Sequence, residues 1–166
     1  MELHELVNEW IKYSKNDLSV AQYLYYNMHP RQLEIICYHS QQSAEKALKA
    51  FLVLNDITPP KIHDLNRLCE MCNDLDGTFS QITQNCSALN LYSNLPRYPF
   101  EIEILDSDAE SAIYKADEVQ KFVENLVLAW DPDFTKVTPE EAKRIAAAEE
   151  SGFISEDEID WDNIGQ

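Results

Sequence analysis

His39-Ser-Gln-Gln-Ser-Ala-Glu-Lys-Ala-Leu-Lys49 is the stretch of this chain that decides its fold. Ala, Leu, Glu, Gln and Lys are strong helix formers, and the stretch consists largely of them. Its Gln, Glu and Lys residues lie beside an apolar stripe that includes Ala44, Ala47 and Leu48. The stretch therefore predicts a helix with one polar face and one face for a core.

Apolar residues keep a helical spacing on both sides of this stretch. A first helix is predicted from roughly Glu2 to Met28, and a second, which contains the stretch, from after Pro30 to about Leu54. At about 1.5 Å per residue each helix is ~37 Å long, and the two are expected to form an antiparallel hairpin. The expected inner stripe of the first helix is Leu6, Trp10, Tyr13, Leu18, Ala21 and Leu24.

Three further helices are predicted downstream. Asp64 is a good N-cap for the third, and the capping-box spacings of Thr78 with Gln81 and of Ser107 with Glu110 are expected to open the fourth and fifth. Short links between amphipathic helices predict an all-α, up-and-down bundle of four or five helices with a long N-terminal helical hairpin. We assign this bundle to residues 1–130 and an acidic C-terminal extension to residues 131–166.

The formal net charge of −17 argues against a broad nucleic-acid-binding surface. The N-terminus has no pattern of a signal peptide, and no apolar stretch is long enough to cross a bilayer, so we expect a cytoplasmic protein that does not bind membranes. Cys69 and Cys72 have the C-x-x-C spacing on an expected helix, without a second pair. Buried, reduced thiols are the expectation there, and no metal site is predicted.

The extension holds 11 acidic and 3 basic residues. Its Thr138-Pro139 is typical of a helix start, which predicts one short helix in the tail. Trp161 and three isoleucines are spaced among the acids. Two readings stay open, a flexible acidic appendage and a docking segment.

Three motifs follow one another along the chain, and together they carry a family resemblance. They are Gln41-Gln42-x-Ala44-Glu45-Lys46-Ala47-Leu48-Lys49, then His63-Asp64-Leu65, then Arg97-Tyr98-Pro99. In this order the chain resembles the HEPN family of bacterial and archaeal helical domains over about residues 5 to 128. The resemblance implies an all-α bundle, often a homodimer, commonly encoded beside a nucleotidyltransferase in toxin–antitoxin pairs.

Many relatives are RNA-cleaving toxins, and others look like nucleotide-binding or non-catalytic modules. The nuclease branch is recognised by an Arg followed by four to six residues and a His. Here Ile102, Glu103 and Ile104 occupy the positions where that His would follow Arg97. A nuclease of this kind needs an imidazole for proton transfer beside a cation for the developing charge. We therefore lean against an enzyme, with Arg97 and His63 as the candidate catalytic residues if it is one.

Asp17 falls on the apolar stripe of the first helix, where an unpaired acid is costly to bury. We expect a half-buried polar network that joins Asp17 to four residues of the second helix, Gln42, Glu45, Lys46 and Lys49. One interpretation is that the network fixes the register of the helix hairpin. The other is that it lines a pocket for a nucleotide or phosphate.

Three more residues have alternative roles. His63 is either a loop staple or a ligand contact, and His39 lies on the same helical face as Gln42 and Lys46. Arg97 either anchors its loop or binds a phosphate. The nucleotide- or phosphate-binding candidates are therefore Gln42, Lys46, Lys49, His63 and Arg97, and Asp17 and Glu45 are assigned to the structural network.

The sequence favours a HEPN-like partner module, non-catalytic or nucleotide-binding, linked to a nucleotidyltransferase or an antitoxin-type partner protein. The alternatives are a metal-independent RNase that uses Arg97 and His63, and a dimeric scaffold without ligand. No cofactor is predicted beyond a possible nucleotide, and a role for RNA is left open. A homodimer is expected.

Overall fold

A computed structural model describes residues 3–93 and 103–129, which belong to the first of two structural units, Met1–Ala129. The described residues form α-helices joined by turns, with no strand among them. The elements are α1 (Leu3–Asn27), α2 (Leu33–Leu54), α3 (Leu65–Leu75), the 3-10 helix η1 (Gly77–Ile82), α4 (Thr83–Asn90) and α5 (Asp106–Ala129). The predicted all-α fold is confirmed.

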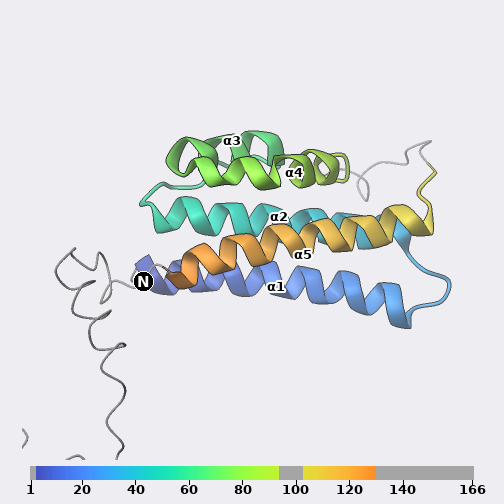
Figure 1. The fold of residues 1–166 in the computed structure, drawn as a ribbon. Helices are drawn as coiled ribbons and strands as arrows, with labels where there is room; N and C mark the ends of the chain where they lie inside the picture. Colours follow the sequence, from blue (N-terminus) through green and yellow to red (C-terminus); the bar gives the residue numbers. More distant parts are fainter. Residues whose placement is uncertain (1–2, 94–102, 130–166) are drawn as a thin grey trace, which may run out of the picture. The chain divides into compact units, whose positions relative to one another are not determined.

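The two long helices α1 and α2 form the predicted antiparallel hairpin (Figure 1). α5 packs along both of them and runs in the direction of α2, while α3 and α4 cover the opposite side of α2. At the closed end of the hairpin, Arg31 donates to Asp106 over 2.8 Å and ties the α1–α2 turn to the start of α5. The bundle is therefore built in two layers around one central helix.

α2 is that central helix, because it packs against α1, α3, α4 and α5. From Ala47 to Leu54 every residue is buried, including the small or apolar side chains on all sides of the helix. Phe79 of η1 extends this core, since its ring lies 4.5 Å from the ring of Phe51 and 5.1 Å from that of Phe122. The hydrophobic contacts of Phe79 thus join the α3–α4 layer to both α2 and α5.

The helix starts are set by carboxylates, although not always the predicted ones. Asp64 caps α3 as predicted, accepting from the amides of Asn66 and Arg67. The capping box of Thr78 with Gln81 was a wrong prediction: Asp76 accepts from both the amide and the hydroxyl of Thr78, so the chain enters a 3-10 helix first.

The inner stripe of α1 also differs from the prediction in its first half. Val7 and Ile11 are buried together with Ser14, whereas Tyr13 is about half exposed. The reason is that Ser14 satisfies its hydroxyl inside the bundle, on the carbonyl oxygen of Ser43 at 2.8 Å. A small paired hydroxyl lets α1 approach α2 more closely than a tyrosine would.

Several predictions lie outside the described residues. They include the loop with Arg97-Tyr98-Pro99 and the acidic extension with its short helix. Within the described ranges, no helix is long and apolar enough to cross a membrane.

Candidate functional site

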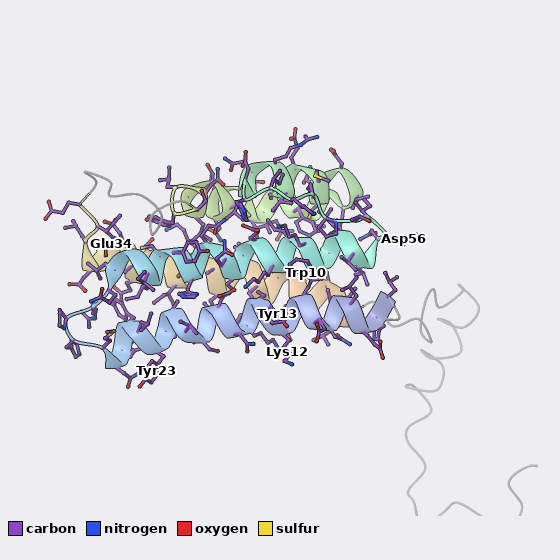
Figure 2. The ribbon with its side chains drawn as sticks, turned by 180° about the vertical axis from the view of Figure 1, so that it is seen from behind. Trp10, Lys12, Tyr13, Tyr23, Glu34 and Asp56 are labelled. Atoms are coloured by element: carbon purple, nitrogen blue, oxygen red, sulfur yellow. The ribbon has the colours of Figure 1, made fainter. Side chains whose placement is uncertain are left out.

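The polar face predicted from the sequence lies on the side of α2 that α5 does not cover. We call it the polar stripe; it comprises His39, Gln41, Gln42, Glu45, Lys46 and Lys49. Viewed from behind, α2 is seen between α1 and the α3–α4 layer, with Trp10 reaching from α1 toward it (Figure 2). The stripe divides into two clusters of charged side chains.

The first cluster joins α1 to α2 through Asp17. One oxygen of its carboxylate lies 2.9 Å from Nδ1 of His39, and the other accepts from the ammonium group of Lys46. That ammonium group is also 5.8 Å from the ring centre of Tyr13, within cation–π range. The carboxylate of Asp17 thus links α1 to α2 through two basic side chains of α2.

The close packing of the two serines places Asp17 in this position. Ser14 lies one turn before Asp17 on α1 and bonds to Ser43, which lies between His39 and Lys46 along α2. Burial opposes ionisation of Asp17, but the hydrogen bonds from His39 and Lys46 outweigh it and hold the pKa of the carboxyl below its ordinary value. Asp17 is therefore an anion at neutral pH.

The second cluster is centred on Glu45 and is more deeply buried. Lys49 donates to Glu45 over 2.7 Å, and the two side chains are only 8% and 5% exposed. The amides of Gln41 and Gln42 donate to the same carboxylate at 3.1 and 3.3 Å. Nδ1 of His63, from the α2–α3 connection, lies 3.1 Å from it. One carboxylate thus organises four neighbours.

Gln41 and Trp10 complete this cluster, although neither was a predicted site residue: Gln41 was predicted only as part of a family motif and Trp10 as part of the apolar stripe of the first helix. Gln41 is fully buried and donates to the carbonyl oxygen of His63 at 3.2 Å as well as to Glu45. The ring of Trp10 lies 5.8 Å from the ammonium group of Lys49. The contact of Gln41 with Glu45 could have been predicted from their i,i+4 spacing. Its second bond is possible because an amide group can donate to a carboxylate and to a backbone carbonyl at once.

The structure therefore brings together six of the seven predicted site residues, all except Arg97. Asp17 and Lys46 lie in the first cluster, and Gln42, Glu45, Lys49 and His63 in the second. Arg97 lies outside the described residues, so its separation from His63 stays untested. His39 contacts Asp17 rather than Gln42.

The chemistry open to the stripe is set by its charge balance. Its two carboxylates face two lysines, so the site is close to neutral unless an imidazole is protonated. His63 is half exposed, and its Nδ1 is held by Glu45, which leaves Nε2 as the atom available to a ligand. The stripe can accordingly hold helices in register, and its rim can offer a hydrogen bond to a bound molecule.

The cysteines take no part in this site. All four are buried as free thiols, and burial raises the pKa of Cys37 to about 12 and that of Cys72 still further. Among the residues placed by the structure, no group of His, Cys, Asp and Glu has the arrangement of a metal site.

Comparison with known proteins agrees with this geometry. The family model of the HEPN domain matches residues 7–126. The crystal structure of an archaeal HEPN homologue is similar at 26% identity and a TM-score of 0.58, covering 73% of this chain and 97% of that one. The crystal structure of a protein from Thermus thermophilus shares the fold at 21% identity and a TM-score of 0.58, covering 72% and 96%. The comparison with curated proteins gave no match.

Proposed function

The chain belongs to the HEPN family, and we propose that it works there as a cytoplasmic, non-catalytic partner module. Its partner in this proposal is a nucleotidyltransferase or an antitoxin-type protein, and it pairs with a second copy of itself as a homodimer. The polar stripe then serves to hold the α1–α2 hairpin in one register, so that the outer faces of the bundle are presented rigidly.

The observation that carries this proposal is that both lysines of the polar stripe are already paired with carboxylates of the bundle. Lys49 is buried against Glu45, and Lys46 is engaged by Asp17, whose side chain is itself largely buried. For either lysine to bind a phosphate it would have to leave a buried carboxylate without its ammonium partner, which costs about 2–5 kcal/mol. A catalytic or phosphate-binding lysine is poorly served by such a position.

The test has two arms. In the first, the tagged chain is co-expressed with a candidate nucleotidyltransferase or antitoxin-type protein from the same genome, and we expect both chains in one peak on size-exclusion chromatography. In the second, purified chain is incubated with RNA, with His63→Ala as the matched control. We expect equal, background levels of cleavage. Cleavage that disappears in His63→Ala would instead support the RNase that uses Arg97 and His63.

A second candidate function, nucleotide binding, is favoured by the rim of the stripe. His63 is 49% exposed, Lys46 keeps 27% exposure, and the half-exposed ring of Tyr13 lies beside Lys46. An aromatic ring next to donors for an anion is the combination that holds a base and a phosphate. In this arrangement Gln42 contributes an amide and Lys49 only balances Glu45.

ATP titration by calorimetry tests this candidate. Lys46→Ala should abolish binding if the rim holds the phosphates, and Tyr13→Ala should weaken it without loss of melting temperature, because that ring is half exposed. Lys12→Ala is the matched control, since Lys12 is an exposed lysine of α1 that points away from α2 (Figure 2). If Lys46→Ala lowers only the melting temperature and ATP binding is unchanged, the nucleotide site is not on the stripe.

A further inference from the structure

A groove lies between α1 and α5, on a different face from the polar stripe. It has a volume of about 240 Å³ and is open to solvent along its length. Its walls come from the last turns of α1 and from residues of α5 spaced over two turns. We call it the tyrosine groove; its lining residues are Gln22, Tyr25, Tyr26, Glu110, Ile113, Tyr114 and Asp117.

The tyrosine rings are unusually open for large side chains in a packed bundle. Tyr26 is 66% exposed and Tyr114 is 64% exposed, one on each wall of the groove, while the buried Ile113 forms its apolar floor. Tyrosine is enriched at protein interfaces because a rigid ring supplies contact area at a low cost in side-chain entropy. The groove therefore has the composition of a recognition surface.

The charged residues that line the groove, Glu110 and Asp117, are both acidic. Asp117 is paired with Lys121 at 2.6 Å on the same helix. For Glu110, no ion pair is found among residues 3–93 and 103–129, whereas Glu118, one residue after Asp117, also interacts with Lys121. The carboxylate of Glu110 next to open aromatic faces attracts a cation, since the face of a tyrosine ring is itself electronegative.

The chain shows this recognition chemistry at the edge of the same groove. The guanidinium group of Arg31 lies 4.4 Å from the ring centre of Tyr25 and donates to Asp106 over 2.8 Å. A second bond from its Nε to the carbonyl oxygen of Tyr25, at 2.8 Å, fixes the stacked position. An arginine held between a tyrosine ring and a carboxylate is thus already stable at this end of the bundle.

We propose that the tyrosine groove binds an arginine-bearing segment of a partner protein. One guanidinium group lies over the rings of Tyr26 and Tyr114 and pairs with Glu110. The α5 wall from Glu110 to Asp117 spans seven residues, or ~10 Å at about 1.5 Å per residue, which is the length of two turns of a bound helix. The groove therefore takes a short basic segment.

NMR titration with a capped peptide containing two arginines one helical turn apart tests this proposal. We expect chemical-shift changes confined to residues 22–26 and 110–118. Tyr114→Ala and Glu110→Gln should each weaken binding by about three- to tenfold, as expected for one cation–π contact or one ion pair. The same peptide with citrulline in place of arginine should not bind.

Tyr23→Ala and Glu9→Gln are the matched controls, because Glu9 is an exposed carboxylate of α1 that does not line the groove. Tyr23 is 66% exposed, about as much as Tyr114 at 64%, but lies on the outer edge of α1 and does not line the groove (Figure 2). The proposal is overturned if these variants weaken binding as much as the groove variants do, or if shift changes spread over all acidic faces. It is equally overturned if the groove proves to be covered by a second copy of the chain, seen as a dimer that Tyr114→Ala dissociates.

The tyrosine groove is the surface through which the proposed partner module would bind its partner, so this inference rests on the proposed function. The two can fail separately. If the peptide does not bind while the co-expressed partner still elutes with the chain, the partner module stands and the groove is not its surface. If the partner elutes with wild type but is lost in Tyr114→Ala and retained in Tyr23→Ala, both hold.

Discussion

The buried ion pair of Glu45 and Lys49 allows a quantitative test of the closed polar stripe. The relevant variants are Glu45→Gln, Lys49→Met and the double variant, compared with wild type in a thermodynamic cycle. Lys49→Met keeps the length of the buried stem, and Glu45→Gln keeps the shape of the acceptor. Each single change therefore leaves mainly one uncompensated charge inside the bundle.

The expected losses differ because the two partners have different remaining neighbours. In Glu45→Gln the buried ammonium of Lys49 loses its counter-charge and keeps only neutral neighbours, the new amide oxygen and the ring of Trp10, so the free energy of unfolding should fall by about 3–5 kcal/mol. In Lys49→Met the carboxylate still accepts from Gln41 and Gln42, which should limit the loss to about 2–3 kcal/mol. The double variant contains no buried unpaired charge and should cost less than the sum by roughly 2 kcal/mol.

Urea denaturation followed by far-UV circular dichroism at neutral pH measures these losses. With a slope of about 2 kcal/mol per molar urea, a loss of about 4 kcal/mol lowers the midpoint by roughly 2 M. Lys121→Met is the control, because it removes an ion pair of the same i,i+4 spacing whose lysine is 63% exposed. Its midpoint should not move measurably.

Two results would refute the reasoning. If Glu45→Gln is as mild as Lys121→Met, the pair is solvated and the stripe is not closed. If the two single losses add up to the loss in the double variant, the two side chains do not interact. Either result would free Lys49 for a ligand and favour the nucleotide-binding function.

Three further predictions concern individual side chains. The pKa of Asp17 is depressed in the folded state, so its stabilisation is fully present above its ordinary pKa of 3.8 and is lost as the pH falls through the folded value. Thermal melts from roughly pH 2 to 7 should show this acid step in wild type and a smaller one in Asp17→Asn. Asp64→Ala removes the cap of α3 and should cost about 1 kcal/mol in urea denaturation. Cys37 and Cys72, which are buried and have raised pKa values, should react with a thiol reagent only on unfolding, and their fast reaction in native buffer would contradict their burial.

The fold could be predicted because its central helix carries the clearest pattern in the sequence. The apolar and small residues around Ala47 and Leu48 predict that α2 is buried on several sides. The polar residues between them predict which side of α2 carries the polar stripe. Asp64 as an N-cap was also predictable, since capping depends only on neighbouring residues.

Other features depend on partners that are distant in sequence. Tyr13 has an apolar ring and a helical spacing, but its register is decided by the bond between Ser14 and Ser43, which are 29 residues apart. Similarly, the pairing of Glu45 with Lys49 follows from i,i+4 spacing, whereas the approach of His63 depends on how the α2–α3 connection folds back. Local spacing could not reveal the bond between Ser14 and Ser43 or the approach of His63 to Glu45.

The central position of α2 has a consequence for how the bundle opens. Because α2 packs against α1, α3, α4 and α5, its amide hydrogens can exchange with solvent only when the whole bundle unfolds. The α3–η1–α4 layer rests on one side of α2 and on α5, so it can detach as a smaller cooperative unit while the hairpin persists. Hydrogen exchange should therefore be slowest along α2 and faster in α3 and α4. The segment that carries the family signature would then be the last part of the bundle to lose its structure.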